Sequence, residues 1–348
     1  DMSQLTWPIL IGILPIINSW VLNYKLKLTK DLEEELAKPT AKLRCETYIK
    51  QIDSLGKELE NILPRFLKFM REKCKEKIPS VNINLVQSCL RIISCFYQPD
   101  IIRVDSANIS EICNYLIAFA VIWSVGANID DKSRQAFSRE VKLRFSGNVN
   151  FNDTASNTSI YDLCINVSNA SFDRFFDKNN DRPPYKYDES VPFFNILIPT
   201  NDTVKYKEIM NFLSANGYNS LFMGETGVGK SVVIMDYLKN EKSGRFIYKS
   251  SNFSAKTTSK NIFDILKTTI YKNGNFAPPA GKKFIYFIDD INLPQLDVFG
   301  SQQPIEFIRQ LIDNKMLYDE KKIKRSIKDT IIMAACAPPS GGRNPVTP

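Results

Sequence analysis

Histidine is absent from this 348-residue sequence. Imidazole is the general base of Ser-His-Asp and Cys-His nucleophilic enzymes and a ligand in the usual zinc hydrolase sites, so its absence excludes both classes. Any chemistry must instead use carboxylates, lysine, arginine, hydroxyl groups, the backbone or a bound metal ion. Hydrophobic residues make up 43% and charged residues 24% of the chain, which argues against disorder, collagen and coiled coil and allows about two globular domains.

Cysteine motifs are absent as well. The seven cysteines are odd in number and scattered, and no two of them form a C-x-x-C pair. Cys89 and Cys95 lie inside an apolar run, which is typical of buried free thiols in a reducing compartment. The seven N-x-S/T triplets would be glycosylation sites only in a secreted protein, and an asparagine-rich composition is sufficient to explain them.

Charge of one sign is nowhere concentrated. The formal net charge is +8, but 46 basic residues are set against 38 acidic ones along the whole chain. The densest basic run, residues 321–325, is short and has no interleaved aromatic residues, so a solvated turn is favoured over a nucleic-acid patch. We therefore expect no nucleic-acid partner.

The apolar segment from Leu5 to Leu22 has two interpretations, a membrane span or a core helix. It contains Pro8 and Pro15, which would leave backbone groups unpaired in lipid, and Asp1 rather than a basic region precedes it. Core packing is favoured, and we expect no membrane partner. The chain also opens without an initiator Met and stops abruptly, so we expect it to be a piece of a longer protein.

Apolar spacing predicts a mainly helical region over residues 1–128. Apolar residues recur at three- and four-residue steps between Ile49 and Leu63 and again between Leu85 and Phe96, the spacing of buried helical stripes. Pro64 is expected to end or kink the first of these helices. Residues 112–123 are apolar nearly all round, which predicts a fully buried helix.

The rest of the chain divides into a polar segment and an α/β region. Residues 129–191 are rich in Asn, Asp, Ser and charge, and we interpret them as a connector or surface insertion with a short strand. Over residues 192–348 short apolar runs alternate with amphipathic stretches, which is typical of a parallel sheet with crossover helices. The expected strands are 220–223, 245–249, 284–288 and 330–335. The expected helices are 202–213, 229–239, 259–271 and 304–314.

A phosphate-binding loop is the strongest motif. Residues 224–231 satisfy the pattern G-x-x-x-x-G-K-[ST], in which glycines let successive N–H groups point at phosphate oxygens and a helix N-terminus adds positive potential. Lys230 would contact the β- and γ-phosphates of ATP or ADP, and the Ser231 hydroxyl would be a ligand of Mg²⁺. The expected nucleotide-binding residues of this motif are Gly224, Glu225, Thr226, Gly227, Val228, Gly229, Lys230, Ser231 and Val232.

An apolar strand that ends in two carboxylates follows further along the chain. Asp289 is the expected second ligand of Mg²⁺. Asp290, the candidate catalytic residue, occupies the position where hydrolysing enzymes of this type usually have a glutamate that orients the attacking water. Aspartate is one methylene shorter, so its carboxylate lies roughly an ångström farther back, and a misplacement of that size can cost about a hundredfold in rate.

The residues around these motifs closely resemble the third AAA+ module of dynein heavy chains. The pair Asp289-Asp290 and the Gln-Pro-Ile-Glu run look more like axonemal than cytoplasmic dyneins, and residues 1–128 resemble the end of the preceding second module. The segments that carry the resemblance are 119–126, 198–206, 252–255, 289–294, 300–306 and 338–348.

This resemblance implies the α/β large subdomain of an AAA+ P-loop NTPase, preceded by a mainly α-helical region. It implies a slice of a six-module motor ring in which ATP turnover in the first module drives movement along microtubules and the third module gates that cycle. Ile198 and Pro199 would lie near the adenine. The implied partners are neighbouring AAA+ modules, dynein intermediate and light chains, and microtubules. The implied location is the cytoplasm, the cytoskeleton and the axoneme of a cilium or flagellum.

Two departures from the family pattern bear on hydrolysis. Asp290 replaces the usual glutamate, and Ala337 falls where a sensor asparagine would donate to the γ-phosphate or the water. We hypothesise a site that binds nucleotide well and hydrolyses it slowly, with a regulatory or structural role. The alternatives are an independent ATPase of another AAA+ line and a nucleotide-locked scaffold that does not hydrolyse. The arginine finger is expected beyond Pro348, with Arg343 as a possible substitute.

Overall fold

The computed structural model describes residues 7–32, 39–98, 109–151, 159–175, 197–241, 243–272, 274–339 and 342–345. The chain divides into two compact units, residues 1–184 (unit 1) and residues 185–348 (unit 2). Each unit is described by itself.

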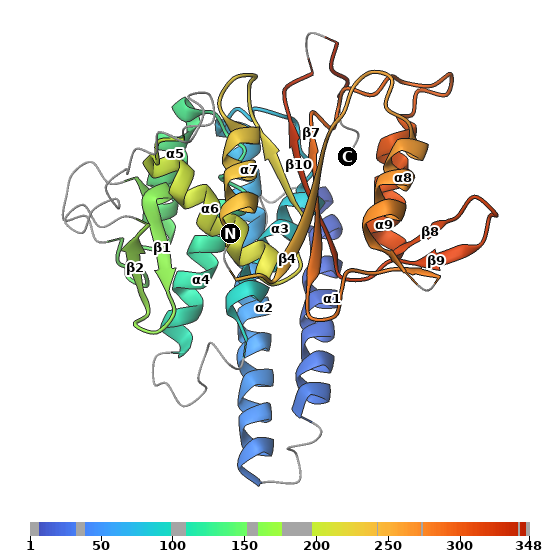
Figure 1. Ribbon diagram of the computed structural model, residues 1–348. Coiled ribbons are helices and arrows are strands. Elements are labelled where there is room, and N and C mark those ends of the chain that lie inside the picture. The colour runs from blue at the N-terminus through green and yellow to red at the C-terminus, as the bar shows by residue number, and fades with distance from the viewer. Residues whose placement is uncertain are drawn as a thin grey trace. The chain divides into compact units, whose positions relative to one another are not determined.

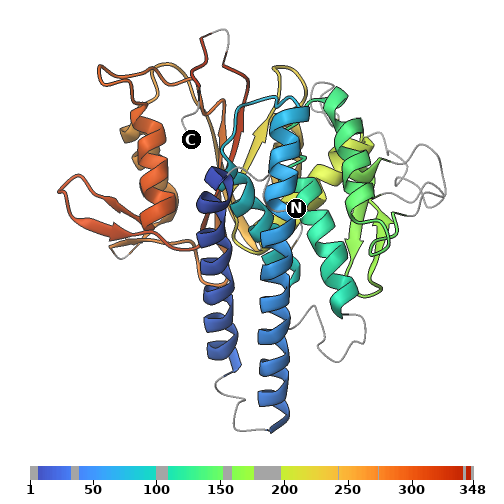
Figure 2. The ribbon, with the colours of Figure 1, turned by 180° about the vertical axis from the view of Figure 1, so that it is seen from behind.

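Unit 1 is mainly helical, as its apolar spacing predicted. Helix α1 packs against α2 and α3, and α3 packs against α4; α1 and α2 lie side by side in both views (Figures 1 and 2). The helices are α1 (Trp7–Leu32), α2 (Pro39–Lys73), α3 (Asn82–Phe96), α4 (Ile109–Ser124) and α5 (Asp131–Arg144), followed by the 3₁₀ helix η2 (Ile160–Asp162) and the antiparallel pair β1 (Leu163–Asn166) and β2 (Ser171–Arg174).

Helix α2 passes through Pro64 to Lys73, so it does not end at this proline, and the alternative, a kink there, stays a prediction. A proline inside a helix removes one backbone hydrogen bond, but packing on both sides of the site opposes that loss. Leu63, Phe66 and Leu67 are all fully buried. Burial of this stripe keeps the helix continuous.

The apolar segment near the start of the chain forms most of α1. Ile13 and Ile17 are buried within unit 1, as core packing requires. Among the residues that the structure describes, no helix combines the length and the apolar character needed to cross a membrane.

The polar segment that was interpreted as a connector contains helix α5 and the β1–β2 pair. Asp130 caps α5 by accepting a hydrogen bond from the Ser133 N–H. Phe137 and Val141 are buried on its inner face. The composition hid this helix because only one narrow face is apolar. Residues 152–158 and 176–196 lie outside the described residues.

Unit 2 is built on a four-stranded parallel sheet in the order β3-β10-β7-β4. Every strand and helix predicted for this region is present, with ends shifted by at most a few residues. The strands are β3 (Ser220–Met223), β4 (Phe246–Asn252), β7 (Lys283–Asp289) and β10 (Thr330–Cys336), and the helices are α6 (Asn201–Ala215), α7 (Lys230–Asn240), α8 (Ser259–Ile270) and α9 (Gln303–Asn314).

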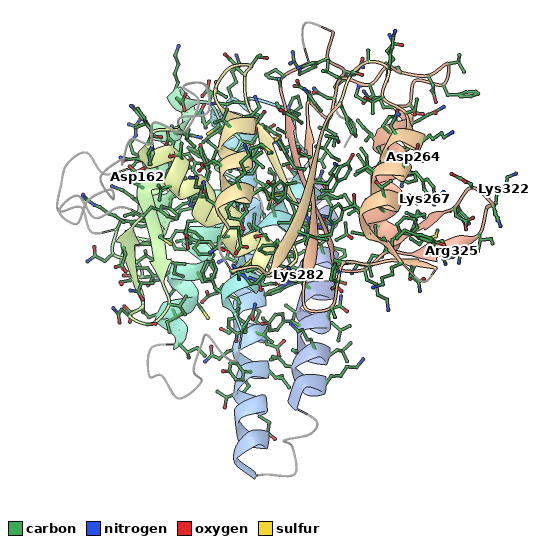
Figure 3. All side chains as sticks on the ribbon, in the orientation of Figure 1. Asp162, Asp264, Lys267, Lys282, Lys322 and Arg325 are labelled. Atoms are coloured by element: carbon green, nitrogen blue, oxygen red, sulfur yellow. The ribbon has the colours of Figure 1, made fainter. Side chains whose placement is uncertain are left out.

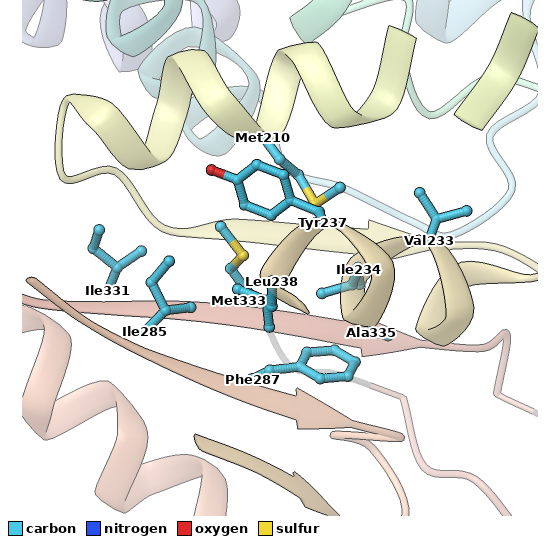
Figure 4. Packing of buried hydrophobic residues seen from close by; sticks show 10 residues of the cluster. All are labelled: Met210, Val233, Ile234, Tyr237, Leu238, Ile285, Phe287, Ile331, Met333 and Ala335. Carbon is cyan, nitrogen blue, oxygen red and sulfur yellow. The ribbon is translucent and has the colours of Figure 1, made fainter. Parts of the chain in front are cut away.

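Helices cover both faces of this sheet. Figure 1 shows α6 and α7 on one side of the strands and α8 and α9 together on the other. Because both faces are covered, β7 and β10 are apolar almost throughout, which is typical of buried parallel strands. On the α6–α7 side, side chains from alternate strand positions meet side chains of the two helices (Figure 4). The buried residues of this core are Met210, Val233, Ile234, Tyr237, Leu238, Ile285, Phe287, Ile331, Met333 and Ala335.

Two short antiparallel pairs were not predicted. They are β5 (Tyr271–Lys272) with β6 (Asn275–Phe276), and β8 (Met316–Tyr318) with β9 (Lys324–Ser326). The basic run lies at the turn of the second pair, where Lys322 has a left-handed backbone and Arg325 pairs with Asp319 at 2.9 Å. Figure 3 labels Lys322 and Arg325 on this hairpin and Lys267 on α8. Residues 321–323 form an exposed turn, as predicted, and Lys324 and Arg325 continue the run into β9.

Candidate nucleotide-binding site

The candidate site lies where three parallel strands of unit 2 end. Met223 at the end of β3 is in register with Cys336 at the end of β10, and Ile288 of β7 is in register with Ala334. The Gly224 N–H donates to the Cys336 carbonyl at 3.3 Å. The phosphate-loop motif and the two carboxylates therefore flank the end of β10. Ligands of open α/β sheets bind at this carboxyl edge.

The loop between β3 and α7 has the backbone that its glycines permit. Gly227 and Gly229 have φ angles of +83° and +86°, in the left-handed region. Gly229 is the residue before α7, and it carries no side chain that could cap the helix. The N–H groups of the first turn are therefore available to an anion, and the helix dipole favours negative charge there.

Lys230 folds back over this loop. Its ammonium donates to the carbonyls of Gly224 at 2.8 Å and Glu225 at 2.7 Å. The cation thus lies against the first two residues of the loop. A phosphate at the helix N-terminus would meet a positive charge and oriented amides together.

Cys336 ends β10, between β3, which leads into the loop with Lys230, and β7, which leads into Asp290. Burial raises the pKa of this thiol to about 11, Lys230 lowers it and Asp290 raises it. The side chain is 1% exposed. Lys230 and Asp290, which are 60 positions apart in the sequence, thus follow the two strands that flank β10.

Asp289 and Asp290 have different surroundings. The Asp289 carboxylate accepts a hydrogen bond from the Asp290 N–H at 3.0 Å. Asp290 has a φ angle of +51°, a left-handed conformation that aspartate tolerates better than most residues. Its Oδ1 accepts hydrogen bonds from Nε of Arg343 at 3.3 Å and from Nη2 at 3.1 Å.

The chemistry of the donor set fits Mg²⁺. Ser231 and Asp289 offer one hydroxyl and one carboxylate, and Mg²⁺ in nucleotide sites takes only one or two protein oxygens beside phosphates and waters. No group of three or more His, Cys, Asp or Glu that could hold a metal ion occurs in the described part of the chain. The two residues suit an ion that arrives with a phosphate.

The sequence did not point to the polar residues that hold residues 342–345 beside the site. Asn292 is 1% exposed, and its Nδ2 donates to the carbonyls of Ala337 at 2.8 Å and Asn344 at 3.1 Å. Asn344 returns two hydrogen bonds, from its backbone N–H to the Asn292 carbonyl at 3.0 Å and from its side chain to the Pro294 carbonyl at 2.8 Å. The signal in the sequence was Asn292 itself, a polar residue that stands between the apolar residues Ile291 and Leu293.

Two further sequence expectations concern Ala337 and Arg343. Ala337 lies directly after β10, is 3% exposed and engages its surroundings through its backbone carbonyl, so its side chain offers no donor to a phosphate or a water. Arg343, considered above as a substitute arginine finger, is paired with Asp290 of its own unit.

The predicted adenine contacts remain predictions. Ile198 and Pro199 come just before Thr200, which caps α6 in a reciprocal pair of hydrogen bonds with Thr203. Three apolar side chains of the predicted site are more than half exposed: Ile198 at 60%, Val228 at 63% and Val232 at 53%. These apolar side chains would be covered by a ligand that reached them.

Comparison with known proteins decides the family. Residues 185–348 match the family model of the P-loop containing dynein motor region, and residues 55–177 match that of the dynein heavy chain AAA lid domain. The chain belongs to the dynein heavy chain family. This dynein segment therefore has the AAA+ P-loop fold in unit 2, and the resemblance inferred from the sequence is confirmed.

Axonemal dynein heavy chains are among its relatives. The segment is 30% identical to dynein axonemal heavy chain 6 of Homo sapiens over 360 aligned residues, which cover 100% of the segment and 8% of that protein. It is 31% identical to dynein axonemal heavy chain 2 of Homo sapiens over 306 residues, 86% of the segment and 7% of that protein. Dynein axonemal heavy chain 1 of Homo sapiens is 31% identical over 366 residues, 98% of the segment and 8% of that protein. The segment thus spans less than a tenth of the length of these relatives.

Proposed function

We propose that unit 2 is a nucleotide-binding AAA+ module of a dynein motor ring, and that it binds ATP or ADP with Mg²⁺ and hydrolyses ATP slowly. The observation that carries the proposal is the arrangement at the ends of β3, β10 and β7. There the loop with Lys230 and the two carboxylates Asp289 and Asp290 flank one buried strand end. Phosphate binding needs oriented amides, a cation and a metal ligand, and all three are present.

Each residue type of the site has a defined role in this proposal. The N–H groups of the loop from Gly224 to Gly229 hold the phosphate oxygens, and Lys230 neutralises their charge. Ser231 and Asp289 hold Mg²⁺, which would polarise the phosphates when bound. Val232 contributes the first turn of α7, and Ile198 and Pro199 cover the adenine.

Slow hydrolysis follows from two features of the described residues. Asp290 is one methylene shorter than the glutamate that usually orients the attacking water, and its Oδ1 is engaged by Arg343. Ala337 supplies no donor to the γ-phosphate. Each feature weakens the transition-state contacts on which phosphoryl transfer depends.

The family models support an arrangement of modules within the segment. The AAA lid match precedes the P-loop match along the chain, so we propose that residues 1–128 are the end of one module, the second, and that residues 192–348 begin the third. Residues 129–191 would connect them, and this connection would include the last part of the AAA lid match, which runs to residue 177. In the full-length protein the module would act beside neighbouring AAA+ modules, in an axonemal motor that turns over ATP, carries intermediate and light chains and moves along microtubules of a cilium or flagellum.

Nucleotide retention by the full-length chain tests the proposal. Labelled ATP is incubated with the protein, free nucleotide is removed, and the bound ATP and ADP are measured. The same measurement is made on a Lys230→Ala chain, and the difference between the two chains is the amount of nucleotide held at this site. We expect Lys230→Ala to abolish retention here, since the cation and its loop contacts are lost. Equal retention by native and Lys230→Ala chains at micromolar ATP would show that the phosphate-loop assignment is wrong.

Single-turnover hydrolysis at the same site tests the slow rate. Asp290→Glu restores the length of the missing methylene and should raise the rate by up to about a hundredfold. Fast native turnover that the substitution leaves unchanged would contradict a slow site.

A nucleotide-locked scaffold is the second candidate, favoured by the engaged carboxylate of Asp290. A scaffold of this kind predicts that bound ATP is not converted to ADP in the native chain or in the Asp290→Glu chain. The other alternative, an independent ATPase of another AAA+ line, is excluded by the matches to the dynein family models.

A further inference from the structure

We infer that Arg343 is a positioning residue that holds the Asp290 carboxylate away from the attacking water and so keeps hydrolysis at this site slow. The inference rests on the proposed function, because it assigns a regulator to the nucleotide site proposed above. It concerns a residue on the segment after β10, residues 342–345, which we call the arm.

The contact between the two side chains is specific. Two nitrogens of one guanidinium, Nε and Nη2, donate to the same carboxylate oxygen, Oδ1 of Asp290, at 3.3 and 3.1 Å. Arg343 is 18% and Asp290 28% exposed, so solvent only partly screens the pair. Hydrogen bonds to charged groups of this kind are stronger than neutral ones.

The arm is fixed independently of this ion pair. Asn344, the neighbour of Arg343, exchanges hydrogen bonds with Asn292 in both directions, at 3.0 and 3.1 Å. Its side chain also donates to the Pro294 carbonyl at 2.8 Å. Since Asn292 follows Asp290 by only two residues, this network brings Arg343 to the carboxylate. The guanidinium is therefore placed by half-buried polar contacts of its neighbour Asn344.

The contact with Arg343 restrains the Asp290 carboxylate. A residue that orients a water needs a carboxylate that can turn to face it. Both contacts of Arg343 are to Oδ1, so they fix the orientation of the short Asp290 side chain, and turning the carboxylate would break them even though Oδ2 remains an acceptor. Ala337, at the sensor position, has no side-chain donor that could compete for the carboxylate. Release of Asp290 therefore requires the arm to move, so movement of the arm would control the rate.

The test measures single-turnover hydrolysis and nucleotide retention in the full-length chain, with Lys230→Ala subtracted as before. Arg343→Ala should raise the rate constant for conversion of bound ATP to ADP by about tenfold, the value of freeing one partly screened charged hydrogen bond. Retention should change less than twofold. Arg343→Met, which keeps the aliphatic stem, should give the same increase, and Arg343→Lys should remain near the native rate because its ammonium still pairs with Asp290.

Two controls separate this role from a structural one. Arg309→Ala removes another arginine of unit 2, one whose exposed pair with Glu306 lies on α9, and should leave the rate unchanged. In an Asp290→Ala background, Arg343→Ala should have no further effect, because the carboxylate that it restrains is gone.

Each contrary result has one meaning. If Arg343→Ala and Arg343→Met leave the rate unchanged or lower it, or if the increase persists without Asp290, the inference is overturned while nucleotide binding stands. If the native chain retains no Lys230-dependent nucleotide, the proposed function fails, and this inference fails with it.

Discussion

Asn292 joins the two segments that follow β7 and β10, and its replacement by alanine should loosen the arm. The side chain is 1% exposed and donates two hydrogen bonds, to Ala337 and to Asn344. Its Oδ1 has no hydrogen-bond partner among the described residues. Asn292→Ala therefore removes two donors without removing a satisfied acceptor.

The cost can be worked from these contacts. Opening that releases both Ala337 and the arm breaks the two hydrogen bonds, each worth about 1 kcal/mol, so the free energy of this opening should fall by about 2 kcal/mol in Asn292→Ala. Since 1.36 kcal/mol corresponds to a factor of ten, local opening should become about 30-fold more frequent. The effect should be confined to the arm and the end of β10, because the sheet does not depend on Asn292.

Hydrogen exchange of the full-length chain measures this opening. The Asn344 N–H donates to the Asn292 carbonyl, a bond that the substitution leaves intact, so its exchange reports arm opening. Asn275→Ala is the matched control, since Asn275 is exposed and its side chain accepts a hydrogen bond from the Ser326 hydroxyl, away from the arm. Exchange at Asn344 that rises about 30-fold in Asn292→Ala and less than threefold in the control supports the reasoning. An unchanged rate in Asn292→Ala would refute it.

Three further predictions follow from burial, charge and backbone. Phe287→Ala should cost unit 2 about 3–5 kcal/mol, seen as faster exchange of β7 amides, whereas Phe299→Ala, at a side chain 90% exposed, should cost less than about 0.5 kcal/mol. Burial raises the pKa of the Cys89 thiol from 9.0 to about 12, so the folded state holds the thiol proton more tightly than the unfolded state does. The resulting contribution to stability is complete below pH 9 and is lost as the pH rises towards 12. Above pH 9 the melting temperature should therefore fall less steeply in Cys89→Ala than in the native chain. Gly229→Ala should weaken nucleotide retention about tenfold because its φ angle is +86°, while Gly147→Ala, with a φ angle of +94° outside the site, should leave retention unchanged.

The sheet and its crossover helices could be predicted because their signals are local. Strands β7 and β10 are apolar at nearly every position, and the glycines of residues 224–229 fix the spacing of the loop that follows β3. Both patterns are contained within a few consecutive residues. Recognising these patterns does not require knowledge of how distant segments of the chain pack.

The elements that escaped prediction depend on tertiary contacts. Strands β5 and β6 are two residues each, too short for any periodicity, and Phe276 is fully buried only because other parts of unit 2 cover it. Helix α2 continues through Pro64 because neighbouring side chains are packed, a property that no local rule contains.

The same limit applies to the site. The loop and its lysine are local, but the pair of Asp290 with Arg343 joins residues 53 positions apart. Sequence reasoning placed Arg343 near the end of the segment without a partner. Only the fold of Asn292 against Asn344 brings the guanidinium back to the carboxylate.

The left-handed backbone at Asp290 limits which residues this position can hold. At a φ angle of +51° most L-residues pay about 1–2 kcal/mol, whereas Gly, Asn and Asp adopt the conformation readily. A glutamate at position 290 would recover reach towards the water and lose part of that gain to backbone strain. Tolerance of substitution and catalytic rate are thus opposed at this position: a library selected for folding should enrich Asp, Asn and Gly, and one selected for turnover should enrich Glu.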